Sequence, residues 1–348
     1  MAEREWHEVA GESAMQSWRI PVIRYRGSSG RPGAYLQAAL HADEQPGVAV
    51  IHELAKLLDG AEADRRLLRD VVLVPNANPI GLHQVVDGRL MGRFHLGSGT
   101  NFNRAFELPQ AGRNSPETSS QRADERLKAI LTGLAEGCDV ILDLHCDKEA
   151  ELYMYCHAEL WPSATDMAAR LGVAAVLLWA GAEEGGAAFE EAVTIGRLPA
   201  TAAKPFLSAT LELRGQADVT PDLAQRDARG LYELLADRGM LADPAVAARP
   251  SWNGPAVRQN QVVNVAAPAL GPLFFEAAVG ARVRQGQCLA RILAVPGDAA
   301  SEIAVPAPAD GLLLIRGRDR LAQPGETIAT IITDRPDPGS VAGRMLSN

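Results

Sequence analysis

The sequence predicts an α/β domain, a β-sheet with helices on both faces, followed by a smaller all-β domain. The first domain is predicted because short runs of β-branched residues and leucine, typical of buried strands, alternate with longer segments of helical pattern. The second is predicted because strand-like runs separated by Gly and Pro occur in two similar copies near the end of the chain. A chain of 348 residues is long enough for two cores, and we expect domains at residues 1–250 and 256–335.

The predicted elements of the first domain alternate along the chain. In order they are strands at 20–26 and 33–40, a helix at 46–58, a strand at 70–75, a helix at 119–134, strands at 139–145 and 209–214, and a helix at 221–239. Thr220 followed by Pro221 is typical of a helix start, since threonine caps the first turn and proline fits its first position.

Two irregular segments separate these elements. Residues 76–116 are rich in Gly, Asn and Arg and form a loop longer than a connection requires, which indicates a functional or disordered segment. Residues 244–255 are bounded by prolines and are predicted to link the two domains.

The second domain contains an internal duplication. PALG at 268–271 matches PADG at 308–311, and RQGQCLARI at 284–292 matches QPGETIATI at 323–331. The pattern resembles the lipoyl/biotinyl-like barrel-sandwich fold, whose cofactor is carried on a lysine in the turn between the halves. The corresponding turn, residues 293–304, has no lysine, and the chain has none after Lys204, which excludes covalently bound lipoate or biotin.

Composition excludes several classes of partner. A formal net charge of −9 argues against nucleic acid, because phosphate binding requires clustered Lys and Arg. The four cysteines form no C-x-x-C pair and predict neither a disulfide framework nor a cysteine zinc ribbon. The first residues are too charged for a signal peptide, and the longest apolar run, residues 173–180, is short of the ~20 residues of a membrane span. We expect a cytoplasmic protein with no membrane partner.

Three residues near predicted strand ends carry metal-binding chemistry. His41 and Glu44 follow one strand, and His145 ends another, so all three are expected at the carboxyl edge of the sheet, where ligands bind. Two histidines and one carboxylate are a set that holds catalytic zinc with one position open. Asp143 shares the strand face of His145 and either orients that histidine or faces solvent.

Further candidates lie in loops. Arg93 and Arg104 suit an anionic group or a developing oxyanion, because guanidinium presents a planar fork, although loop arginines are also commonly solvated. Residues 183–186 (EEGG) form either an acidic lid over a cationic substrate or a solvated loop.

Together these motifs resemble the succinylglutamate desuccinylase/aspartoacylase family, which is related to the zinc carboxypeptidases. The resemblance rests on HADE at 41–44, NPIG at 78–81, NFNRAF at 101–106, DLH at 143–145 and LELRG at 211–215, with the β-domain after them. It implies a zinc-carboxypeptidase-like mixed sheet. It also implies one Zn²⁺ per chain, held by His41, Glu44 and His145. It further implies Glu212 as the general base and acid, and Asn103 and Arg104 as residues that bind the substrate. From the chemistry of guanidinium we also expect Arg93 to bind the substrate, and Arg104 or Arg93 to stabilise the oxyanion in catalysis.

The chain departs from the family pattern at two positions. Ala42 stands where a glycine is usual, and Asn101 stands where an aspartate is usual, which removes a carboxylate.

We expect a zinc-dependent deacylase that cleaves the amide of a small N-acyl amino acid or related amine. A peptide-cleaving metallocarboxypeptidase and a non-catalytic binding protein remain alternatives, and a homo-oligomer is expected. The β-domain is expected to pack beside the 76–116 loop and limit substrate size.

Overall fold

The computed structural model describes residues 2–108, 122–181, 186–198 and 206–333. Its α-helices are α1 (Pro46–Ala63), α2 (Pro79–Leu82), α3 (Ala123–Ala135), α4 (Trp161–Leu171), α5 (Phe189–Ile195) and α6 (Pro221–Asp237). The strands of the large sheet are β1 (Glu3–Ala10), β2 (Ser17–Tyr25), β3 (Pro32–Ala38), β4 (Asp70–Val74), β7 (Val140–Asp147), β9 (Leu152–His157), β10 (Ala175–Trp179), β11 (Leu207–Gly215) and β12 (Ala256–Arg258).

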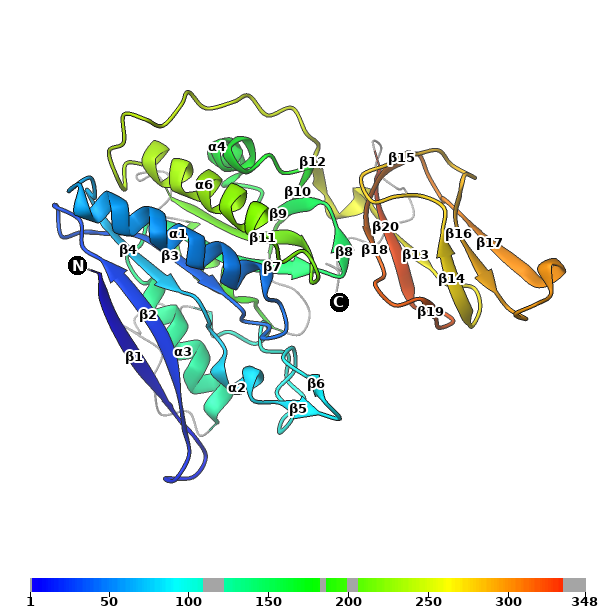
Figure 1. The fold of residues 1–348 in the computed structure, drawn as a ribbon, viewed down its shortest axis with the longest axis horizontal. Coiled ribbons are helices and arrows are strands. Elements are labelled where there is room, and N and C mark those ends of the chain that lie inside the picture. The colour runs from blue at the N-terminus through cyan, green and yellow to red at the C-terminus, as the bar shows by residue number, and fades with distance from the viewer. Residues whose placement is uncertain (1, 109–121, 182–185, 199–205, 334–348) are drawn as a thin grey trace.

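The large sheet is mixed, as the sequence predicts. Within the described residues its order is β1-β2-β4-β3-β7-β11-β9-β10-β12. The neighbours β4, β3, β7 and β11 run parallel, whereas β11 pairs antiparallel with β9. Helices α1, α4 and α6 pack together on one face, and α3 and α5 cover the other (Figure 1). Among the described helices, none combines the length and apolar character that a membrane span requires.

Most predicted elements of this domain are confirmed, with different ends. α1 continues to Ala63, and the side chain of Thr220 accepts a hydrogen bond from the Leu223 N–H at the start of α6 (3.3 Å). The sequence did not predict β1, because this edge strand is charged and largely exposed, with Val9 its buried residue. The 76–116 loop contains α2 and a short hairpin, β5 (Val85–Val86) and β6 (Arg89–Leu90), and its residues after 108 lie outside the described part.

The end of the chain forms a separate all-β unit, here called the C-terminal module, residues 262–333. Its strands are β13 (Val262–Ala266), β14 (Gly271–Phe275), β15 (Arg282–Val283), β16 (Cys288–Leu293), β17 (Glu302–Pro306), β18 (Gly311–Arg316), β19 (Leu321–Ala322) and β20 (Thr327–Thr333). They form two sheets around a core of their own, which includes Leu273, Ile292 and Ile331. An all-β unit therefore stands in the region where the sequence predicts one, and its assignment to the barrel-sandwich fold stays a prediction.

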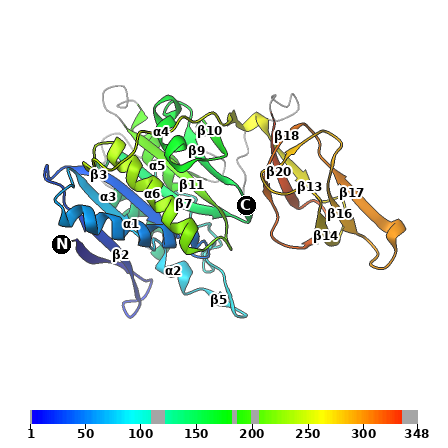
Figure 2. The ribbon, with the colours of Figure 1, turned by 45° about the horizontal axis from the view of Figure 1, so that its top comes forward.

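The module is attached to the α/β domain by a strand pair and an apolar contact. β8 (Glu149–Ala150), from the α/β domain, pairs antiparallel with β18 of the module. A small buried cluster joins Tyr153 and Leu177 to Leu314 and Ile332. In both ribbon views β18 and β20 are the module strands nearest to the α/β domain (Figures 1 and 2). In the part of the chain that the structure describes, hydrogen bonds between the two parts reach Glu149 of β8 and Gln216, directly after β11. Packing of the module beside the 76–116 loop stays a prediction.

Candidate metal centre and active-site cavity

Three adjacent parallel strands position the candidate catalytic residues. β3 and β11 lie on either side of β7, and all three run in the same direction. His145 is near the carboxyl end of β7, and Glu212 is its partner in register on β11. His41 and Glu44 follow the end of β3, so the predicted gathering at one sheet edge is confirmed.

The backbone beyond β3 turns sharply so that His41 reaches this edge. Ala39 adopts a left-handed conformation, with φ of 55°, which turns the chain directly after the strand. Gly47, at the start of α1, also helps to bring this segment to the sheet edge. A Cβ there would lie 2.9 Å from the Cβ atoms of Ala38 and Leu144, so glycine allows the helix start to approach β3 and β7 closely.

His41, Glu44 and His145 form a compact buried cluster. His41 Nδ1 lies 2.9 Å from Glu44 Oε1, and His145 Nδ1 lies 2.9 Å from Glu44 Oε2. The ligand atoms of the three residues all lie within 4.8 Å of one another. The backbone N–H of Cys146 also donates to Glu44 Oε2, at 3.0 Å. Each side chain is at most 4% exposed, so the cluster is shielded from bulk water.

The opposite nitrogen of each imidazole has its own acceptor. His145 Nε2 lies 2.9 Å from Asp143 Oδ2, and Gln37 Nε2 donates to the other oxygen of Asp143 at 3.0 Å. His41 Nε2 lies 2.8 Å from Asn101 Oδ1, so an amide oxygen is the acceptor for this ring. These acceptors favour a proton on each Nε2 and leave each Nδ1 lone pair facing Glu44. The sequence left two alternatives for Asp143, and the structure agrees with the one in which Asp143 orients His145 rather than facing solvent.

The charged groups of the cluster shift one another's pKa. Burial raises the pKa of Glu44, but His41 and His145 outweigh it and hold that pKa well below its usual range. Burial also lowers the pKa of His145, but Asp143 and Glu44 overcome it and raise that pKa well above its usual range. For His41 burial prevails, and its pKa is lowered. A buried anionic carboxylate is thus held between two imidazoles.

This donor set fits a divalent transition metal. Two imidazole Nδ1 atoms and a carboxylate converge within 4.8 Å of one another, and imidazole with carboxylate is a donor combination that zinc accepts. The hydrogen bonds that the two Nε2 atoms donate to Asp143 and Asn101 favour the tautomer that metal binding requires.

The other predicted site residues lie around the cluster. Arg93 Nη1 donates to Glu44 Oε1 at 3.1 Å. The preceding Gly92 allows this contact, because a Cβ there would lie 2.5 Å from the Asp43 backbone nitrogen. Asn103 Nδ2 lies 3.3 Å from His145 Nε2, while its Oδ1 accepts the backbone N–H of Phe189 at 2.9 Å.

Two further predicted residues complete the set. Arg104 Nη1 donates to the Asn103 carbonyl at 2.8 Å. Glu212 is partly buried, and burial, with the charges of Glu44 and Asp147, raises its pKa well above the usual range against the opposing His145 and Arg93.

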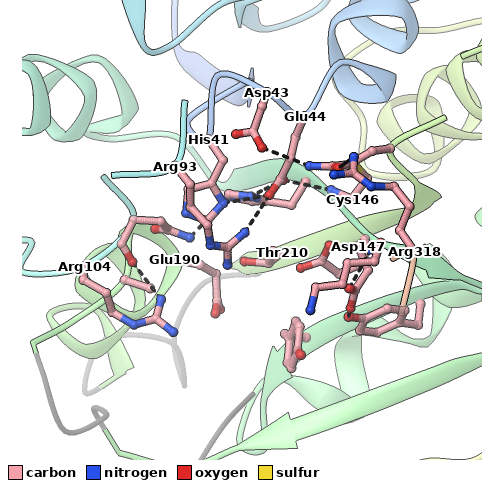
Figure 3. A pocket seen from close by; sticks show the side chains of 18 of the residues that line it. His41, Asp43, Glu44, Arg93, Arg104, Cys146, Asp147, Glu190, Thr210 and Arg318 are labelled. Carbon is pink, nitrogen blue, oxygen red and sulfur yellow. Dashed lines mark hydrogen bonds and ion pairs between the residues drawn. The ribbon is translucent and has the colours of Figure 1, made fainter. Parts of the chain in front are cut away.

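One cavity of about 260 Å³ is lined by all the residues predicted as ligands or as catalytic or substrate-binding groups (Figure 3), which are His41, Glu44, Arg93, Asn103, Arg104, His145 and Glu212. Sequence reasoning did not find several others that line it: Asp43, Cys146, Asp147, Lys148, Tyr153, Tyr155, Ala188, Glu190, Glu191, Thr210, Gln216, Arg318 and Asp319. The closely spaced arginines in IRGRDR, residues 315–320, are a signal that could have indicated the contribution of the module. Residues 183–185 of the predicted lid, which spans 183–186, lie outside the described part of the chain.

Several solved structures share the fold of this chain. A succinylglutamate desuccinylase/aspartoacylase family protein from Shewanella amazonensis superposes with a TM-score of 0.81 at 25% identity, covering 95% of this chain and 99% of its own. A second such protein, from Shewanella frigidimarina, gives 0.78 at 23% identity, with 96% and 97% covered. The ectoine utilization protein EutE (DoeB) from Ruegeria pomeroyi, in a product-bound structure, gives 0.71 at 18%, with 95% of each chain covered.

A family model identifies the family of this chain. No curated protein matches the chain. A family model described as the succinylglutamate desuccinylase/aspartoacylase catalytic domain matches residues 31–238, more than half of the chain. The chain therefore belongs to the succinylglutamate desuccinylase/aspartoacylase family, whose members are hydrolytic deacylases that cleave amide bonds.

Proposed function

We propose that this protein is a zinc-dependent deacylase that hydrolyses the amide of a small N-acyl amino acid or related N-acyl amine. The observation that carries the proposal is the position of Glu212, which is paired in register with His145 and lines the same cavity as the His41 and Glu44 side chains. A carboxylate beside a two-histidine, one-carboxylate set is the arrangement that amide hydrolysis needs.

His41, Glu44 and His145 would hold the zinc. When bound there, zinc supplies Lewis acidity, which polarises the amide carbonyl and acidifies water. Glu212 takes a proton from the water whose oxygen adds to the carbonyl carbon. As the carbon–nitrogen bond breaks, Glu212 gives the proton to the leaving nitrogen, so the products are an amine and a carboxylic acid, which releases its proton to water and becomes a carboxylate.

Arginines bordering the cavity suit the charges of such a substrate. Arg93 is held by Glu44, and its guanidinium faces the cavity beside the cluster, where it can oppose negative charge developing on the carbonyl oxygen. Arg104 and Asn103 lie on the side of the cavity formed by the Asn101 loop, where they can bind the substrate.

The size of the cavity favours a small substrate over a peptide. About 260 Å³ lies below the 300–1,000 Å³ typical of drug-sized ligand sites. The C-terminal module also contributes to the cavity wall through Arg318 and Asp319, which narrows the space for a polypeptide.

The proposal is tested by amine release from a panel of N-acetyl, N-succinyl and N-formyl amino acids and diamines, with and without a zinc chelator. Hydrolysis of at least one compound, abolished by the chelator and restored by zinc, would support it. Cleavage of peptides alone would indicate a carboxypeptidase, and equimolar metal without any hydrolysis would indicate a binding protein.

A further inference from the structure

The C-terminal module reaches the cavity through a single turn. Residues 317–320 connect β18 to β19, and the module residues that line the cavity, Arg318 and Asp319, both lie in this turn. Figure 3 shows the Arg318 side chain extending toward the cluster from the side opposite Arg104.

The arginines on either side of Arg318 hold the turn in place. Arg316 Nε donates to Glu149 Oε2 at 2.6 Å, and Arg320 donates to the other oxygen of the same carboxylate. Both guanidinium groups also stack on the ring of Phe275, at 5.0 and 5.1 Å from its centroid. Because β8 pairs with β18 beside these contacts, the turn is fixed relative to the α/β domain.

Arg318 is bound differently from these two neighbours. Its Nη1 donates to Gln216 Oε1, and Gln216 Nε2 in turn donates to Asp43 Oδ2 at 3.0 Å. Asp43 directly precedes the metal-ligand candidate Glu44 in the sequence. The side chain remains 58% exposed, and the nearby Asp319 carboxylate, itself 74% exposed, is 3.9 Å from its Nε. Within the described residues, its other N–H groups donate no hydrogen bond.

We propose that Arg318 is a specificity-determining residue, which binds a carboxylate of the substrate with the guanidinium donors that face the cavity. This inference rests on the proposed function, since it assigns part of the substrate of that reaction. A fixed backbone and an oriented guanidinium lower the entropy cost of binding, and the planar fork matches a carboxylate in two-point geometry. Arg318 would thereby make the module part of the substrate site.

The kinetic test compares three amides whose charge lies in different places. An N-succinyl alkylamine carries its carboxylate on the acyl side, an N-acetyl amino acid carries it on the amine side, and an N-acetyl amino acid amide carries none. Arg318→Met should lower kcat/KM by about 10- to 100-fold for one of the two charged compounds, mainly through KM, as expected for a lost hydrogen bond to a charged group. For the uncharged amide, kcat/KM should change less than about threefold. Arg318→Lys should recover part of the kcat/KM that Arg318→Met loses for the charged compound.

The matched control is Arg284→Met, which removes an exposed arginine of the module that does not line the cavity. This variant should match the wild type on all three compounds. An equal loss on all three with Arg318→Met, or no loss on any, would overturn the proposal.

A binding measurement separates this proposal from the proposed function. If the wild type hydrolyses none of the three amides, the proposed function fails, and the same compounds are titrated calorimetrically as ligands. Binding of a charged compound that is at least tenfold weaker in Arg318→Met than in wild type would still support the role of Arg318. Equal affinities, or no binding to either protein, would contradict it.

Discussion

Glu212 and His145 occupy paired positions on the adjacent parallel strands β11 and β7, and both side chains line the same cavity. They are 67 positions apart in the sequence, yet the register of the ladder brings them together. The register therefore fixes the spacing between the candidate proton carrier and the metal-ligand cluster.

Replacement of His145 should remove the metal. His145→Ala deletes one of the three converging ligand atoms, so metal content measured by elemental analysis should fall from about one per chain to near zero, and hydrolysis should be lost. His52→Ala, at an exposed position of α1, is the control and should keep the metal. Equal metal in wild type and His145→Ala would contradict the ligand assignment.

Replacement of Glu212 should separate metal binding from catalysis. Glu212→Gln keeps the shape of the side chain but cannot accept a proton, so kcat should fall about 10²- to 10⁴-fold with the metal retained. Exposed Glu136→Gln serves as the control for a lost carboxylate. Parallel loss of metal and activity would make Glu212 a ligand or a structural residue instead.

Asn101 should affect metal affinity through His41. Its Oδ1 lies 2.8 Å from His41 Nε2, so Asn101→Ala leaves that ring without its acceptor and should weaken zinc binding about 10- to 100-fold in competition with a chromophoric chelator. Asn101→Asp restores an acceptor and should retain wild-type affinity or exceed it. Unchanged affinity in Asn101→Ala would show that the contact does not orient the ring.

Glu190 should make the stability of the protein depend on pH. This cavity carboxyl is 3% exposed, and burial followed by the charge of Glu191 raises its pKa well above the usual range. A raised folded-state pKa contributes stability that is complete below the ordinary carboxyl pKa of about 4.3 and is lost as pH rises toward the folded-state value. Glu190→Gln stays neutral and can still accept the Thr194 hydroxyl, which is 3.2 Å away.

The gain in unfolding free energy of Glu190→Gln over wild type should therefore be larger at pH 8 than at pH 5, as measured by urea unfolding. Glu159→Gln, at an exposed position, corrects for the general loss of one carboxylate. The same difference at both pH values would show that Glu190 ionises normally in the folded protein.

Removal of the C-terminal module should destabilise the α/β domain or broaden its substrate range. A chain ending at Pro255 loses β12, leaves β8 without β18, and exposes Tyr153 and Leu177 to water. Its Tm should be lower than that of the full chain, and bulkier amides should become substrates if it stays folded. Unchanged Tm together with an unchanged substrate range would mean that the module has neither role.

The sequence by itself determined the alternation of strands and helices and the candidate ligands. Buried strands such as β4 and β7 are continuous apolar runs, and the start of α6 has its own capping signal, so these local patterns persist in the fold. His41, Glu44 and His145 stand at strand ends, where parallel strands expose side chains at a common edge. The lack of a lysine after Lys204 likewise needed no structure.

Only the tertiary structure decided which distant residues meet. Asn101 contacts His41 across 60 residues, and Arg318 reaches Gln216 across 102, because strand pairing and the β8–β18 ladder bring these segments together. The edge strand β1 is also set by pairing with β2 rather than by its own apolar pattern. Local sequence patterns reflect backbone preference and burial, whereas contacts over long separations depend on sheet order and register, which no single segment of the chain contains.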